Sequence, residues 1–177
     1  MNRLTYRLLL IVLFSCAAFV AVDGQTSSQL RARYGEPQMV EKENDRPVVE
    51  RFLVRPDIQM TIRYTGSGEP CEALLEPVPN STPKTGRPEH APDRDYMSTT
   101  EVVGLINEIL PDAKRGKRLN SVQFNGGDPK MNLHHLGCTG LSFVNFENAH
   151  ISAVSWCWGG TFSATIQWGK KQCQVKP

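Results

Sequence analysis

The densest group of potential catalytic or metal-binding side chains is segment 134–138, His-His-Leu-Gly-Cys. Zinc prefers imidazole nitrogens and thiolates, so His134 and His135 with Cys138, and Cys157 or Cys173, could form a zinc site. The spacing does not match the paired, short-spaced ligand motifs of zinc-binding domains. Either histidine could instead activate Cys138 as a nucleophile, which requires a cysteine outside any disulfide.

Five cysteines are present, an odd number. Cys16 lies in an N-terminal segment that we expect to be removed. The four others are an even number in an oxidising compartment, which predicts two disulfides and disfavours a free catalytic thiol. The sequence leaves all three connectivities open among Cys71, Cys138, Cys157 and Cys173.

Residues 1–24 have the pattern of a secretory signal peptide. A basic start precedes the uncharged run Leu8–Val22, and small residues precede a cleavage site after Gly24. That run has 15 residues, fewer than the roughly 20 needed to cross a bilayer. No later apolar run is as long, so we expect residues 25–177 to be an exported domain, secreted or periplasmic, without a transmembrane segment.

Composition narrows the class of protein further. The 177 residues carry 20 Lys and Arg against 18 Asp and Glu, and 40% of them are hydrophobic. Removal of residues 1–24 takes away two Arg and one Asp, which leaves a formal charge of +1. Such a balanced chain is not a general nucleic-acid binder, and its size is that of one globular domain.

Two tryptophans stand out near the C-terminus. If Gly159-Gly160 is a two-residue turn, Trp158 faces Thr161 and Trp156 faces Ser163. The core face then holds Ile151, Ala153, Ser155, Cys157, Phe162, Ala164, Ile166 and Trp168. Trp156 and Trp158 fall on the opposite face among small hydroxyl residues. They form either a platform for a sugar ring or protein partner, or a surface covered by a helix or loop.

The strongest helix prediction is 98–110, where Val102, Leu105, Ile106 and Ile109 form one apolar face. Ser98 and Glu101 have the spacing of a capping box. A short helix is expected over 26–34, and a surface linker over the charged segment 38–47. Residues 79–95, rich in proline, should form an exposed loop between two halves. Strands are predicted at 49–54, 58–65, 71–78, 120–124, 141–146, 151–158 and 161–168.

Both halves have the rough order of a helix followed by antiparallel strands. We therefore predict an α+β domain in which one or two helices pack on one face of an antiparallel sheet, braced by disulfides.

Three further motifs have ordinary interpretations. The basic run 114–118 could be a processing site or bind a polyanion, but it is typical of a solvated loop after a helix. Glu72 and Glu76 are expected to form surface ion pairs with Arg63 rather than a catalytic pair. Asn80 begins an Asn-Ser-Thr glycosylation sequence, usable only in a eukaryotic secretory pathway.

No catalytic constellation and no cofactor motif emerges from these residues. We expect a small exported binding protein for a protein or carbohydrate partner, acting through Trp156 and Trp158. One alternative is a secreted hydrolase, possibly metal-dependent, with a site around His134 and His135. Another is a structural component of the cell envelope.

Overall fold

A computed structural model describes residues 25–81, 95–124, 140–156, 160–169 and 173. The predicted signal peptide and most of the proline-rich loop 79–95 lie outside these residues. So do His134, His135, Cys138, Cys157 and Trp158.

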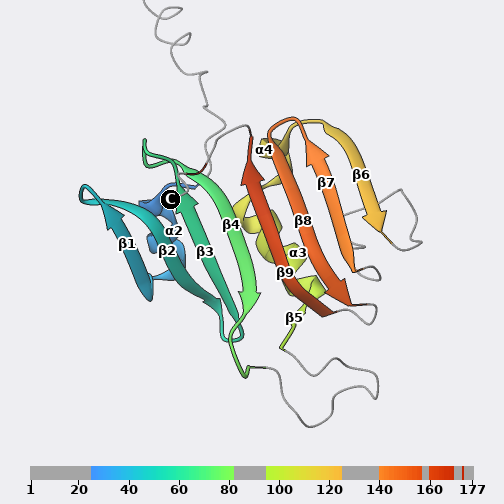
Figure 1. The fold of residues 1–177 in the computed structure, drawn as a ribbon, viewed down its shortest axis with the longest axis horizontal. Coiled ribbons are helices and arrows are strands. Elements are labelled where there is room, and N and C mark those ends of the chain that lie inside the picture. The colour runs from blue at the N-terminus through green and yellow to red at the C-terminus, as the bar shows by residue number, and fades with distance from the viewer. Residues whose placement is uncertain (1–24, 82–94, 125–139, 157–159, 170–172, 174–177) are drawn as a thin grey trace, which may run out of the picture.

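The described chain is mainly an antiparallel sheet, as the sequence predicts (Figure 1). The path of paired strands is β1-β2-β3-β4-β9-β8-β7-β6, and β5 pairs with β9. In chain order the elements are α2 (Ser27–Tyr34), β1 (Met39–Glu43), β2 (Arg46–Arg55), β3 (Ile58–Tyr64), β4 (Pro70–Pro77), β5 (Met97–Ser98), α3 (Thr99–Ile109), α4 (Asp112–Arg115), β6 (Arg118–Phe124), β7 (Leu141–Phe146), β8 (Ala149–Trp156) and β9 (Gly160–Trp168).

The order of elements repeats, as the sequence suggested. Helix α2 is followed by the meander β1 to β4, and α3 with α4 is followed by the meander β6 to β9. The last strands of the two meanders, β4 and β9, pair antiparallel from Glu72–Gln167 to Leu75–Ala164. This pairing joins the two meanders into one sheet.

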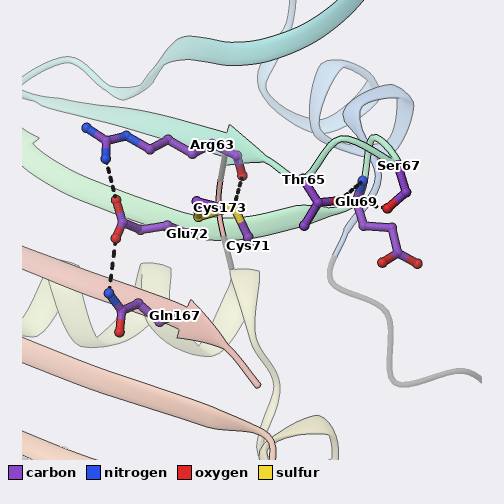
Figure 2. The surroundings of a disulfide bond; sticks show 8 residues. All are labelled: Arg63, Thr65, Ser67, Glu69, Cys71, Glu72, Gln167 and Cys173. Atoms are coloured by element: carbon purple, nitrogen blue, oxygen red, sulfur yellow. Dashed lines mark hydrogen bonds and ion pairs between the residues drawn. A yellow bond between two sulfur atoms is a disulfide. The ribbon is translucent and has the colours of Figure 1, made fainter. Parts of the chain in front are cut away.

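One disulfide lies at this junction. Cys71 at the start of β4 is bonded to Cys173, with the two Cα atoms 5.4 Å apart (Figure 2). The bond closes a loop across 102 residues of sequence, for which the chain-entropy model gives a stabilisation of about 4–5 kcal/mol. It ties the end of the chain to the strand that joins the halves.

Burial alternates along the strands with a period of two. Residues such as Met60 on β3, Ile151 on β8 and Ile166 on β9 are completely buried, whereas their neighbours in sequence are partly exposed. Leu30 of α2 and the apolar residues of α3 belong to the same buried cluster as these strand residues. In the view of Figure 1, α2 and α3 lie behind the sheet.

The two helices begin differently. Helix α2 has a complete capping box, in which Thr26 accepts from the Gln29 amide and Gln29 bonds back to Thr26. Gly35 ends it at a φ of 84°, in the left-handed region that favours glycine. Helix α3 has the predicted extent, but the predicted capping box of Ser98 and Glu101 is wrong, because the Ser98 side chain makes no capping hydrogen bond.

The charged segment 38–47 is not a linker. It forms β1 and the start of β2, joined by a turn in which Asn44 and Asp45 have φ values of 49° and 62°. Positive φ at two successive residues is the geometry of a tight hairpin turn, and Asn and Asp tolerate it better than most residues. Pairing with β2 therefore outweighs the absence of an apolar pattern.

The predicted register of the C-terminal hairpin is also wrong. Trp156 pairs with Gly160 and Val154 with Ser163, with a register shift between them. The shift buries Thr161, which accepts or donates a 2.9 Å hydrogen bond with Thr99, and leaves Phe162 partly exposed. An irregularity of this kind adds a residue to one strand, so the two-residue turn that we assumed does not set the pairing.

The Cys71–Cys173 disulfide leaves one possible partner for each of the two other cysteines that follow the predicted signal peptide. Cys138 and Cys157 lie outside the described residues, but they are the two cysteines left in a chain that begins at Gln25. We expect peptide mapping without reduction to find Cys71–Cys173 and Cys138–Cys157. A crossed pairing, or two free thiols, would contradict this assignment.

Candidate functional site

The side of the sheet opposite the buried cluster carries partly exposed side chains, and we call it the outer face. Its members come from both halves of the chain because β4 and β9 are paired. Its apolar members are Leu53, Leu74, Phe143, Val154 and Trp156, and its hydroxyl members are Thr61, Ser152, Ser163 and Thr165. Its other polar members are Arg63, Glu72, Gln167, His150, Asn145 and Asn120.

Trp156 lies on the outer face near the end of β8. It is half-buried, and its ring contacts that of Tyr96 at a centroid distance of 5.7 Å. Gly160 lies beneath both rings, where an added Cβ would be 3.0 Å from Tyr96 and 3.2 Å from Trp156. The absence of a side chain at Gly160 therefore lets the two aromatic rings pack close to the strand.

A row of polar residues crosses the outer face from strand to strand. Arg63 and Glu72 form an ion pair at 3.5 Å, as the sequence predicts, and Gln167 donates to Glu72 at 3.1 Å (Figure 2). The register then places His150 next to Gln167. These cross-strand neighbours lie close enough to interact directly, so the row ties β3, β4 and β9 together.

The same row continues over β8, β7 and β6. His150 Nδ1 is 2.6 Å from Asn145 Oδ1, and the Asn145 amide donates to Asn120 at 2.5 Å. The His150 ring also contacts that of Phe143 at a centroid distance of 5.6 Å. Burial lowers the pKa of His150, which favours a neutral ring at pH 7. Asn145 contacts both His150 and Asn120, so the row extends to β6.

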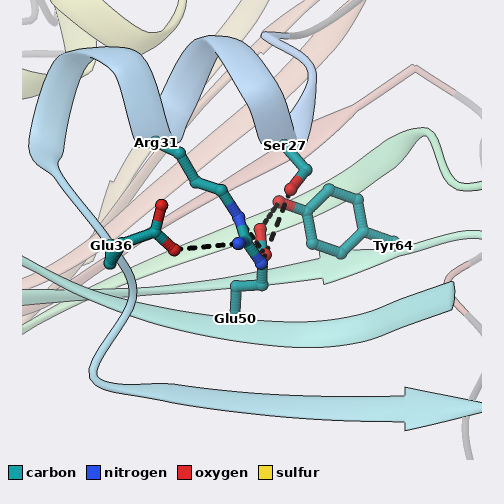
Figure 3. A network of polar contacts seen from close by, with 5 residues as sticks. All are labelled: Ser27, Arg31, Glu36, Glu50 and Tyr64. Atoms are coloured by element: carbon teal, nitrogen blue, oxygen red, sulfur yellow. Dashed lines mark hydrogen bonds and ion pairs between the residues drawn. The ribbon is translucent and has the colours of Figure 1, made fainter. Parts of the chain in front are cut away.

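A second polar cluster lies within the core, between α2 and the sheet (Figure 3). Glu50 of β2 is completely buried. Its carboxylate accepts hydrogen bonds from Tyr64 at 2.5 Å, from Arg31 at 2.5 and 3.0 Å, and from Ser27 at 3.1 Å. Arg31 also pairs with the exposed Glu36 at 2.9 Å. A buried carboxylate with donors on both oxygens is a stable arrangement, so this cluster holds α2 on the sheet.

Our sequence reasoning missed Glu50 and Tyr96, for different reasons. Glu50 shares the period of two with Phe52 and Val54, so its position on the apolar face of a strand could have been read from the sequence. Tyr96 follows the proline-rich loop outside any periodic pattern. Its contact with Trp156 depends on the pairing of β5 with β9, which no local pattern encodes.

The basic run 114–118 is not simply a solvated loop. Arg115 is only 2% exposed, and it donates to the Leu110 carbonyl at 2.9 Å and to Asn107 at 2.5 Å. It also pairs with Asp112 and lies over the Phe146 ring. Burial removes Arg115 from any role in gripping a polyanion or in processing by a protease.

The metal and thiol hypotheses concern residues outside the described ranges, His134, His135 and Cys138. Within the ranges that the structure describes, no three His, Cys, Asp or Glu residues are grouped so that they could hold a metal ion. No helix in those ranges is long and apolar enough to span a membrane. Asn80, the possible glycosylation residue, is exposed with a φ of 61°.

No family model, no curated protein and no solved structure matches the chain.

The Glu50 cluster predicts how stability depends on alkaline pH. Burial, and then the hydrogen bond to Glu50, raises the pKa of Tyr64. An unfolded tyrosine ionises near pH 10, so above that pH the unfolded chain releases a proton that the folded chain keeps. Stability should therefore fall as pH rises above about 10, by up to about 1.4 kcal/mol per pH unit for this one group.

Urea unfolding at pH 8 to 11.5 tests this expectation. Tyr64→Phe should flatten the alkaline decline relative to wild type, at the cost of lower stability at pH 8. Burial also raises the pKa of Tyr34, so Tyr34→Phe is the matched control and should flatten the decline less. Equal slopes for wild type and Tyr64→Phe would show that Tyr64 ionises freely in the folded protein.

Proposed function

We propose that this protein is an exported, non-catalytic binding module that recognises a protein partner through the outer face of its sheet. In this proposal α2 and α3 cover one face, the Cys71–Cys173 disulfide braces the sheet, and the other face is available to the partner. The observation that carries it is the outer face itself, which combines partly exposed aromatic and aliphatic residues with a row of polar contacts between strands.

The size of the outer face supports a protein partner. Eight strands spaced about 4.8 Å apart, each with about six residues at about 3.3 Å, give roughly 700–800 Å². A standard protein interface buries about 800 Å² on each side. Two hollows of the described surface lie elsewhere, one at the turns near Asn44 and Gly66, the other beside α2 near Gln29 and Lys114. A face of this area without a hollow in it suits a protein better than a small ligand.

The composition of the outer face points the same way. Trp, Tyr and Arg are the residues that most often dominate binding energy in protein interfaces, and Trp156, Tyr96 and Arg63 supply one of each. Leu53 is 42% exposed and Leu141 is 40% exposed, which adds apolar contact area at separate points. Trp158 lies outside the described residues, so the proposal rests on Trp156.

Truncation of Trp156 tests the aromatic part of the face. Proteins from the native compartment should be captured on immobilised wild type, identified, and then titrated as purified partners by calorimetry. We expect Trp156→Ala to raise Kd at least tenfold, because aromatic anchors commonly contribute about 2 kcal/mol or more. Trp156→Phe should restore part of the affinity, and urea unfolding checks that both variants fold.

A bulky charge at the centre of the face provides a second test. Thr165 lies in the middle of the outer face on β9, and Ala32 is an exposed residue of α2. Thr165→Arg should abolish binding of the same partner, whereas Ala32→Arg, which adds the same charge elsewhere, should leave Kd unchanged. Loss of binding with Ala32→Arg alone would place the interface on the helical side.

A carbohydrate partner is an outcome of the same experiments. The Tyr96–Trp156 pair could stack on a sugar ring, and a glycan array probed with wild type and Trp156→Ala would detect this. Saturable binding to a glycan, without any protein ligand sensitive to Thr165→Arg, would replace the proposal.

A further inference from the structure

Helix α2 is held on the sheet by few apolar contacts. Of its eight residues only Leu30 is buried, whereas six of the eleven residues of α3 are buried. Tyr34 adds a partial contact, because its ring lies 6.5 Å from that of Phe52. Area removed from water is what holds an amphipathic helix on a core, so α2 has a much smaller apolar attachment than α3.

The first polar attachment of α2 is Glu50 of β2. This completely buried carboxylate accepts hydrogen bonds from Ser27 and Arg31 of α2 (Figure 3). It also accepts one from Tyr64 of β3, at 2.5 Å. When α2 leaves, Glu50 therefore keeps a donor that belongs to the sheet.

The second polar attachment of α2 is Glu108, near the end of α3. Its carboxylate accepts a hydrogen bond from Tyr34 and pairs with Arg33, at 3.4 Å in both cases. Its backbone carbonyl accepts a hydrogen bond from the Gln25 amide at 2.9 Å. The same carboxylate pairs with Arg55 of β2 at 2.7 Å, so Glu108 also keeps a partner from the sheet when α2 leaves.

Release of α2 as one unit returns its polar groups to water together. A buried pair of charges gains little net stability, because both charges lose their hydration when the pair forms. The Arg31–Glu50 pair has this character, since the Arg31 side chain is 33% exposed and that of Glu50 is fully covered. Removal of one partner alone leaves the other charge buried and unpaired, which costs far more. These contacts therefore favour release of the whole helix over the loss of single bonds.

The chain that follows α2 provides a hinge. Gly35 ends the helix at a φ of 84°, and apart from its chain neighbours no atom lies within 4 Å of the position that a Cβ would take. Hydrogen bonding to β2 resumes at Gln38, whose amide donates to the Arg51 carbonyl at 2.7 Å. In a mature chain that begins at Gln25, this short connection is the one covalent link between α2 and the sheet.

We propose that α2 is a releasable strap, which detaches from the sheet as one unit about Gly35 while the two meanders stay paired. In the closed state Tyr34 lies against Phe52, and Ser27 and Arg31 lie against Glu50. In the open state these positions of β2 lose that cover on the helix side of the sheet, and the outer face on the other side is unchanged. The strap follows from the contacts of α2 and does not rest on the proposed function.

Hydrogen exchange of the mature protein at increasing urea concentration tests the strap without any partner. Backbone amides of residues 30–34 should exchange faster than those of β3 and α3. Their exchange rates should depend little on urea below the unfolding transition, because a local opening exposes little surface. If the amides of α2 have the same protection and the same urea dependence as those of β3, α2 leaves only on global unfolding and the proposal is wrong.

Two arginine variants separate release of the strap from a loss of overall stability. Arg31→Gln removes the pair with Glu50 and should speed exchange of the α2 amides by about tenfold or more, with β3 and β8 unchanged. Arg63→Gln is the matched control, because it removes an ion pair of the outer face, and it should leave α2 unchanged. Equal acceleration of α2, β3 and β8 in Arg31→Gln, or no acceleration of α2, would overturn the proposal.

Discussion

The pairing of β4 with β9 is the contact on which the rest of the structure depends. Each of these strands ends a meander, and each would otherwise leave an open edge in the middle of the molecule. Their pairing makes one buried face from two halves, and it makes one continuous outer face as well. The Cys71–Cys173 bond ties the chain end to the same place, so the covalent and the hydrogen-bonded links reinforce one junction.

The two helices are attached to this sheet by different forces. Helix α3 buries an apolar side, with Val102, Leu105 and Ile106 completely covered, so area removed from water holds it. Helix α2 has one buried residue, Leu30, and needs the directional bonds of Arg31 and Ser27 to Glu50. A polar attachment fixes position more strictly than an apolar one, because its bonds are lost when the groups move apart.

The outer face carries two kinds of contact between side chains. The polar row runs from Arg63 to Asn120 across the outer face, while the Trp156 and Tyr96 rings contact each other at one end.

Much of the fold could be predicted from the sequence, because it follows from local periodicity. The alternation of Met60, Ile62 and Tyr64 with polar neighbours specifies β3, and the spacing of Val102, Leu105 and Ile106 specifies α3. The charged segment that forms β1 carries no such pattern. It becomes a strand because β2 offers it a ladder of partners.

The candidate site was less predictable. The strand faces were largely foreseen, since a register error of two residues keeps every side chain on its own face. The sequence did not predict the irregularity near Thr161 or the contact of Tyr96 with Trp156. Both depend on which strand lies beside β9. Glu50 could be placed on an apolar face from its spacing, but its donors, Arg31 and Tyr64, lie 19 and 14 residues away.

By itself, then, the sequence determined most of the helices and strands, the buried side of most strand residues and the ion pair of Arg63 with Glu72. The tertiary structure decided the order of the strands, the partner of Cys71 and the donors that satisfy Glu50. The physical reason is the separation along the chain over which each effect acts. Periodicity acts between neighbours along the chain, whereas pairing, disulfide formation and burial of a charge depend on which distant segments meet.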